Sequence, residues 1–305
     1  MKIAVFADVH GNYHALEAVL NDIERERVDV TVCARDMINP FPDSLRVWRK
    51  LKALNIPMVR GNHEDYVLTC HNASHDNDIR TGIQFRPVQL LAQQLNAQTL
   101  TQIAALPLSL PVPGPGGDDV LICHASPFSN SRSYAIHFDN EMTGDISRIP
   151  AKTIVGGHIH MQWERRWQDK WLLLTGSVGL AFEGVAAANY LLLRHQNGSW
   201  RAEFKAVPYN RQAAADALAN NGFLRQGGPI AWLMFDELAT SEMRLVPFLS
   251  KFCPTPKPVT LTDWQRWTQR YLEAIGRWEK VRPYVEAGNG AHPAPDAPGG
   301  LTHPA

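Results

Sequence analysis

Short apolar runs alternate with amphipathic segments along residues 1–60. Residues 3–7 and 28–34 are apolar runs that end in polar residues, which predicts two buried strands. Residues 13–26 and 45–54 carry apolar side chains at helical spacing, and residues 57–60 predict a third strand. This alternation of strand and helix indicates an α/β fold, with a parallel sheet that has helices on its faces.

The rest of the chain continues the pattern and then changes it. Residues 64–106 predict helices, with Pro87 at a helix start, and residues 129–149 form a polar excursion. A turn rich in proline and glycine is expected at 111–119. Further strands are predicted at residues 120–123, 153–155, 171–174, 190–194 and 200–207, the last after an Asn197-Gly198 hairpin turn. Helices are predicted at 211–219, 229–238 and 262–284.

These patterns divide the chain into three parts. Residues 1–208 are predicted to form one α/β catalytic domain, and residues 209–287 a helical C-terminal region. Residues 288–305 are rich in glycine, proline and alanine, which predicts a disordered tail.

Composition narrows the function. Lys and Arg total 30, as do Asp and Glu, so there is no basic field that would attract nucleic acid or an anionic membrane. No apolar run approaches the ~18 residues of a membrane span. Cys33 and Cys123 lie in apolar runs, which indicates buried, reduced thiols. We therefore expect a soluble cytoplasmic protein that attracts phosphate only through a local site.

Polar side chains gather where the apolar runs end. They are Asp8, His10 and Asn12, then Arg35 and Asp36, Asn62 and His63, His124, and finally His158 and His160. Ligands of α/β sheets bind beyond the carboxyl ends of the strands, so strands placed in one sheet would bring these side chains to one edge. Carboxylate oxygens with imidazole nitrogens suit Mn²⁺, Fe or Zn²⁺, and the lack of clustered thiolates argues against a structural zinc site.

The spacing of these residues suggests two ions. Residues i and i+2 of an extended strand point the same way, so Asp8 and His10 could bind one ion. His158 and His160 have the same spacing, although a curling strand end would divide them between two ions. Two ions about 3.5–4 Å apart can bind both the attacking and the leaving oxygen of an in-line displacement, with a shared hydroxide as nucleophile.

In their order, these motifs resemble the calcineurin-like metallophosphoesterases. The resemblance rests on Asp8-x-His10-Gly-Asn12, Asp36, Gly61-Asn62-His63-Glu64, His124 and Gly157-His158-x-His160, and it extends over residues 1–208. Gly176-Ser177-Val178-Gly179 is similar to a turn of the bacterial branch of that family. The resemblance implies a four-layer α/β-β-α sandwich, here with a small C-terminal helical appendage.

The resemblance also implies roles for individual residues. Asp8, His10 and His160 would bind a first metal, Asp36 would bridge, and Asn62, His124 and His158 would bind a second. His63 would stay free of metal, face the substrate, and act as an acid. Manganese is the expected metal, with iron, zinc or nickel as alternatives. The expected reaction is hydrolysis of a phosphate mono- or diester by a hydroxide that bridges the two metals.

Rival interpretations exist for the whole chain. One is a catalytically weak phosphoesterase-like scaffold used for protein binding, although all the ligand positions and His63 are present. Another is a protein-serine/threonine phosphatase, but the Arg-containing pattern of those enzymes after the bridging aspartate is absent. We expect a phosphorylated small molecule as substrate, with nucleotides among the candidates, and oligomerisation is left open.

Arg35 stands where the family usually has glycine. It could point into solvent or onto the sheet face, bind a substrate phosphate, or narrow the site and lower activity. Arg35 and Asn12 are the predicted substrate contacts.

Two other features have a plain and a functional interpretation. Cys123 is predicted to be a buried residue that packs in the core rather than a thiol nucleophile. The stripe of Trp264, Trp267, Tyr271, Ile275 and Trp278 is predicted to pack against the core or neighbouring helices, the alternative being an oligomer contact or a lip of the substrate cleft.

Overall fold

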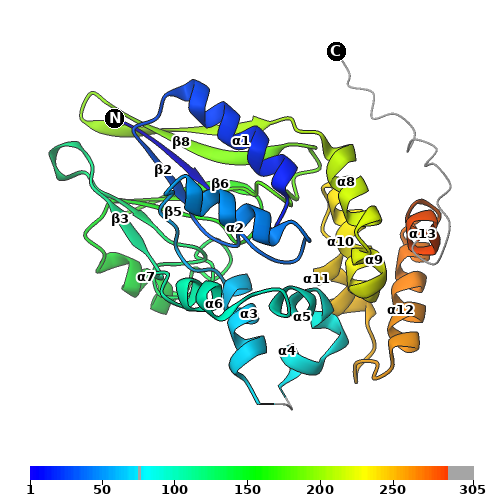
Figure 1. The fold of residues 1–305 in the computed structure, drawn as a ribbon. Helices are drawn as coiled ribbons and strands as arrows, with labels where there is room; N and C mark the ends of the chain where they lie inside the picture. Colours follow the sequence, from blue (N-terminus) through cyan, green and yellow to red (C-terminus); the bar gives the residue numbers. More distant parts are fainter. Residues whose placement is uncertain (75–76, 288–305) are drawn as a thin grey trace.

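Two β-sheets form the centre of the computed structural model, which describes residues 1–74 and 77–287 (Figure 1). The first sheet has four strands in the order β2 (Val30–Cys33), β1 (Lys2–Phe6), β8 (Ala188–Gln196) and β9 (Ser199–Val207). The second has five in the order β3 (Leu110–Val112), β4 (Val120–Ile122), β5 (Thr153–Gly156), β7 (Lys170–Thr175) and β6 (Gln162–Trp167). Strands β1 and β2 are parallel, as are β4, β5 and β7.

Alternation along β1 shows how the layers form. Ile3 and Val5 pack between the two sheets, against residues such as Ile122 of β4, whereas Ala4 and Phe6 face the opposite side and pack against helices. That outer side is covered by α1 (Tyr13–Glu26) and α2 (Ser44–Ala53) (Figure 1). The outer face of the second sheet packs against α7 (Asn140–Ser147). The predicted four-layer sandwich is therefore confirmed.

A series of short helices connects the two sheets. It comprises α3 (Asn62–Asn72), α4 (Asp78–Thr81), η1 (Ile83–Phe85), α5 (Arg86–Ala92) and α6 (Ala97–Ala104). Pro87 lies in the first turn of α5, as predicted. The strand expected at 57–60 is reduced to one parallel bridge between Met58 and Cys33. Pro57 has no N–H to extend this ladder.

One further strand and two element boundaries also differ from the prediction. Strand β6 was not expected, because its exposed Glu164, Arg165 and Arg166 hide the period of two that marks a strand. The expected turn at 111–119 begins as β3 and contains only a short 3-10 turn, η2 (Pro115–Gly117). The helix expected at 262–284 breaks at Gly276, whose φ of 70° does not continue a helix.

The C-terminal helices share a hydrophobic core of their own. They are α8 (Arg211–Asn220), α9 (Phe223–Gln226), α10 (Gly228–Thr240), α11 (Leu245–Pro247), the π-helical turn η3 (Phe248–Phe252), α12 (Leu261–Ala274) and α13 (Trp278–Ala287). Trp264 and Tyr271 are buried in this core, which confirms the packing interpretation for both residues. Residues 288–305, predicted to be disordered, lie outside the described residues, and the division at residue 208 stays a prediction.

Within residues 1–74 and 77–287, the helices are too short or too polar to cross a bilayer.

A buried carboxyl group in α10 makes stability depend on pH. Burial raises the pKa of Glu237 from 4.5 to about 7. Hydrogen bonds from the backbone N–H groups of Leu245 and Arg244 have the opposite, smaller effect on this pKa. Both of these N–H groups donate to its Oε1 at 2.8 Å. A raised pKa means that the folded state holds the proton more tightly than the unfolded state, so this stabilisation is complete below pH 4.5 and disappears as pH rises through about 7.

We expect Glu237→Gln to remove this pH dependence, because glutamine keeps the accepting oxygen and cannot ionise. The difference in free energy of unfolding between wild type and variant should change by about 3 kcal/mol between pH 4 and pH 8. Urea denaturation at several pH values measures it. Glu242→Gln, on a side chain that is 59% exposed, is the control. An unchanged pH profile in Glu237→Gln would contradict the assignment.

Candidate metal centre

The structure brings together all seven side chains that were predicted to bind metal. Asp8 and His10 follow β1, Asp36 follows β2, His124 follows β4, His158 and His160 follow β5, and Asn62 begins α3. The expectation of a single sheet edge was wrong, because β1 and β2 belong to the first sheet and β4 and β5 to the second. The strand ends of both sheets contribute to one centre.

The chain curls sharply where these strands end. Asp8, His10, Asp36, His158 and His160 all have positive φ, between 45° and 78°. Residues other than glycine rarely adopt this conformation, and such strain is concentrated at functional sites. Hydrogen bonds between the loops hold it in place: Asp8 N–H donates to the Arg35 carbonyl and His10 N–H to the Asp36 carbonyl, both at 2.8 Å.

The first metal group consists of Asp8, His10 and His160, whose ligand atoms lie within 4.8 Å of one another. Nδ1 of His10 is 2.6 Å from the Asn39 carbonyl, and Nδ1 of His160 is 2.7 Å from the Leu180 carbonyl. Each Nδ1 must therefore carry the proton, which leaves both Nε2 atoms as acceptors. Burial lowers the pKa of His10 to about 3, which favours this neutral form.

Acceptor atoms face one another in this group without a proton between them. The Nε2 atoms of His10 and His160 are 2.9 Å apart. Oδ1 of Asp8 is buried with no hydrogen-bond partner and lies 3.7 Å from His160 Nε2. Acceptors that converge in this way repel one another unless a cation lies among them, so the group fits a divalent metal.

The second metal group consists of Asp36, His124 and His158, with Asn62 among them. Nε2 of His124 is 3.2 Å from Asp36 Oδ2 and 2.8 Å from Asn62 Oδ1, while its Nδ1 lies 3.4 Å from the Ala34 carbonyl. Nδ1 of His158 is 3.2 Å from the same Asn62 oxygen. The Asn62 oxygen thus faces acceptor atoms, as expected for a ligand of a cation. If the Asn62 amide were turned, its nitrogen would instead donate hydrogen bonds to these acceptors, including one to Asp36 Oδ2 at 3.1 Å.

His160 belongs to the first metal group and His158 to the second, and Asp36 lies where the two groups meet. The positive φ values of the two histidines turn them to different groups, as a curling strand end allows. Asp36 also lies within 4.8 Å of His10 and His63. Burial would raise the pKa of Asp36, but its electrostatic interactions with His124 and His63 hold that pKa well below its usual range. Asp36 therefore lies between the groups as an ionised carboxylate.

Comparison with known proteins identifies the family of this chain. The model of the calcineurin-like phosphoesterase superfamily domain matches residues 1–198. The chain belongs to this superfamily. An uncharacterized protein of Methanocaldococcus jannaschii is 24% identical over 233 residues, which cover 72% of this chain and 92% of that protein.

Solved structures of low sequence identity share the fold. A metallophosphoesterase from Sphaerobacter thermophilus is 20% identical, with a TM-score of 0.61 over 79% of this chain and 99% of that one. A hypothetical protein from Pyrococcus horikoshii is 13% identical, with a TM-score of 0.62 over 76% and 97%.

His63 stands beside both groups of this calcineurin-like chain. It is half-buried near the start of α3, and its N–H donates to Asp36 Oδ1 at 3.1 Å. Its Nδ1 lies 2.8 Å from the amide nitrogen of Asn39. Since that nitrogen can only donate, a neutral His63 carries its own proton on Nε2. Its role as an acid stays a prediction, because His63 also lies near His10 and Asp36 at a distance that could suit a metal.

Glu64 is a positioning residue that the sequence interpretation missed. Its side chain is fully buried, with Oε2 accepting from Gly61 at 2.8 Å and from Asp36 at 3.2 Å. Oε1 accepts from Met37 at 3.1 Å and Ile38 at 3.4 Å. The signal was a glutamate three residues after Gly61, which supplies the glutamate half of a capping box, since glycine has no side chain to complete it. The bonds to residues 34–43 between β2 and α2, here called the Asp36 loop, could not be foreseen from the sequence.

We expect Glu64→Gln to destabilise the fold, because an amide nitrogen in place of Oε2 would face the N–H groups of Gly61 and Asp36. Two buried donors would lose their acceptor, at a cost of about 2–4 kcal/mol. Urea denaturation of the metal-free protein measures this cost. Glu141→Gln is the control, on a side chain that is 72% exposed. Equal stability of Glu64→Gln and wild type would show that the acceptor role is wrong.

The two predicted substrate contacts have other partners. Asn12 is the N-cap of α1: it accepts from Ala15 N–H at 3.1 Å and donates to the Gly179 carbonyl at 3.0 Å, which explains it without a substrate. Arg35 is fully buried, and its guanidinium donates to the Leu108 carbonyl. Burial lowers the pKa of Arg35 to about 10. Arg35 therefore does not point into solvent, and contact with a phosphate would require it to move.

Cys123 is buried, and burial raises the pKa of its thiol to about 12. A thiol that ionises so weakly is packing rather than a nucleophile, which agrees with the prediction.

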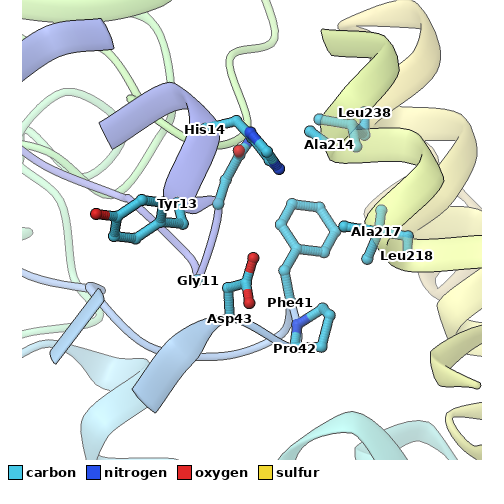
Figure 2. Close-up of a pocket in the computed structure, with 11 residues that line it drawn as sticks. Gly11, Tyr13, His14, Phe41, Pro42, Asp43, Ala214, Ala217, Leu218 and Leu238 are labelled. Atoms are coloured by element: carbon cyan, nitrogen blue, oxygen red, sulfur yellow. The ribbon is translucent and has the colours of Figure 1, made fainter. Parts of the chain in front are cut away.

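A small hollow lies apart from the metal groups (Figure 2). It is lined by the start of α1, by Phe41, Pro42 and Asp43, and by side chains of α8 and α10. In Figure 2 the ring of Phe41 points toward Ala217 and Leu218 of α8. The hollow therefore marks the junction between the Asp36 loop and the C-terminal helices.

Proposed function

We propose that this chain is a dinuclear metal-dependent phosphoesterase that hydrolyses a phosphate mono- or diester of a small molecule. The observation that supports it most strongly is the pair of acceptor-lined groups that meet at Asp36. Asp8, His10 and His160 would hold one ion, and Asn62, His124 and His158 the other, with Asp36 shared. Manganese suits this mixture of oxygen and nitrogen ligands, with iron, zinc or nickel as alternatives.

The proposed ligand set would also favour an anionic ester as substrate. Divalent cations in such a site supply a hydroxide nucleophile near neutral pH and neutralise phosphate charge. Asp8 and Asp36 are the carboxylates of the set, and Asn62 contributes no charge, so two divalent ions would leave a positive site. The net charge of the chain is zero, so this local charge provides the attraction.

His63 provides the acid in this proposal. With the Asn39 amide on Nδ1, Nε2 of His63 is left to hold the transferable proton; the imidazolium form would donate that proton to the leaving oxygen and return to neutral imidazole. Asn39 orients the ring, and its carbonyl also holds His10. One residue of the Asp36 loop thereby fixes both the acid and a ligand of the first group.

Elemental analysis combined with a substrate screen tests the proposal. We expect two metal ions per chain after supply of Mn²⁺, and turnover of at least one class among nucleotides, cyclic nucleotides and aryl phosphate mono- and diesters. A protein that binds no metal would refute the dinuclear centre. Two bound metals without turnover of any class would favour the protein-binding scaffold.

A further inference from the structure

We propose that the C-terminal helices position ligands of the metal centre, because Phe41 and Phe182 connect them to His10 and His160 of the first metal group. The proposal rests on the proposed function, since it takes both histidines as ligands. The superfamily model ends at residue 198, so it does not include these helices. The helices would thus set how tightly the first ion is held.

Phe182 and its neighbours hold His160 from several sides. The Phe182 ring stacks on the His160 ring, with centroids 4.8 Å apart and an angle of 22° between the planes. Phe182 N–H donates to the His160 carbonyl at 3.2 Å, and the Leu180 carbonyl accepts from His160 Nδ1 at 2.7 Å. Residues 180–182 therefore fix both the backbone and the ring of this histidine.

The same segment is anchored in the C-terminal helices. Leu180 is buried in their hydrophobic core, and Phe182 packs against that core. Gly184 N–H donates to the carbonyl of Ser241, the C-cap residue directly after α10, at 3.1 Å. The segment 180–184 thus runs from His160 to α10, so a shift of α10 is passed to the ligand.

Phe41 makes the corresponding connection to His10. Its N–H donates to the His10 carbonyl at 2.9 Å, two residues beyond the Asn39 carbonyl that accepts from the His10 ring. Its side chain is buried in the C-terminal core, where it meets the Phe223 ring edge-on at 6.5 Å between centroids. Figure 2 shows the ring directed at α8. Both histidines of the first group are therefore fixed by aromatic anchors in one core.

The second group is supported from within the sandwich. His124 donates to the Ala34 carbonyl, which follows β2, and Asn62 begins α3 directly after Gly61, whose N–H donates to Glu64. Loosening the C-terminal anchors should therefore affect the first ion more than the second. This difference separates a positioning role from a general loss of stability.

Phe182→Ala in the full-length chain tests the proposal. We expect affinity for one of two Mn²⁺ ions, the same ion that His160→Ala weakens, to fall about 10–100-fold, as when the support of a metal ligand is lost, with the other ion unaffected. Titration calorimetry gives the two affinities, and paramagnetic resonance distinguishes a coupled ion pair from a single Mn²⁺. Phe182→Tyr keeps the ring and should restore binding. Phe223→Leu, which alters the anchor of Phe41 from the helical side, should weaken the same ion.

Phe252→Ala is the matched control, because Phe252 packs in the same core against Trp267 and Tyr271. It should lower the Tm and leave both Mn²⁺ affinities unchanged. Equal weakening by Phe252→Ala and Phe182→Ala, or equal weakening of both ions by Phe182→Ala, would overturn the positioning role. His160→Ala is the reference variant: normal binding of two ions by it would overturn the proposed function. Loss of one ion by His160→Ala but not by Phe182→Ala would overturn only this inference.

Discussion

Asp36→Asn should remove nearly all turnover and at least one of two bound metal ions. Among residues 1–74 and 77–287, Asp36 is the carboxylate that groups both with His10 and with the His124–His158 pair, with ligand atoms within 4.8 Å. The amide keeps one oxygen but loses the charge that balances two divalent cations. We expect kcat/KM for an aryl phosphate ester to fall on the order of 10³-fold. Steady-state kinetics and elemental analysis of the same preparation measure both effects.

Two comparisons make this result interpretable. Asp169→Asn changes a carboxylate that is 60% exposed, and it should alter neither metal content nor kcat/KM. Circular dichroism of Asp36→Asn should match wild type, because the Asp36 backbone N–H still donates to Glu64. Normal turnover with full metal content in Asp36→Asn would refute the shared-ligand assignment.

The sequence predicted the fold and the position of the centre where local patterns decide them. Apolar runs that end in polar residues indicated β1, β2, β4 and β5, and the residues after them converge as expected. The pattern could not say that two sheets supply these ends, because strand pairing is set by contacts between distant segments. The edge strand β6 was missed for a different reason, since its outward side chains are polar and its sequence lacks apolar alternation.

Supporting contacts were less predictable than ligands. A buried Glu64 that accepts from Met37 and Ile38 depends on loops that meet only in the folded chain. Arg35 illustrates the opposite case: a charged residue next to a site suggests contact with an anion, yet the structure buries it. Burial of a long charged side chain is rare, so the sequence could not choose between the solvent-facing and the sheet-facing position of Arg35.

The anchors in the C-terminal helices were also invisible in the sequence. Phe41 and Phe223 are separated by 182 positions, yet their rings meet in one core. An apolar side chain after a metal-binding loop predicts burial but not the partner that covers it. Contacts of this kind explain how a helical region outside the superfamily match can influence a metal ligand.

His63→Ala should retain both metal ions and lose about 10²–10⁴-fold in kcat, the usual contribution of a positioned acid. All seven proposed ligands of the two groups are unchanged, and the Asn39 carbonyl still holds His10. Elemental analysis and steady-state kinetics measure the two quantities. His71→Ala is the matched control, because His71 lies on the same helix and contacts the Ala92 carbonyl. Loss of metal from His63→Ala, but not from His71→Ala, would show that His63 is a ligand instead.

Esters with different leaving groups distinguish two possible roles of His63 in the reaction. If its Nε2 proton passes to the leaving oxygen, the loss in His63→Ala should be large for an alkyl ester and small for a nitrophenyl ester, whose leaving oxygen needs no proton. If His63 instead stabilises charge on the phosphate oxygens, the loss should be the same for both esters. A series of aryl and alkyl esters assayed with Mn²⁺ therefore separates the two roles. A loss independent of the leaving group would replace proton donation by charge stabilisation, and the contact between Asn39 and Nδ1 would then serve to orient an electrostatic donor.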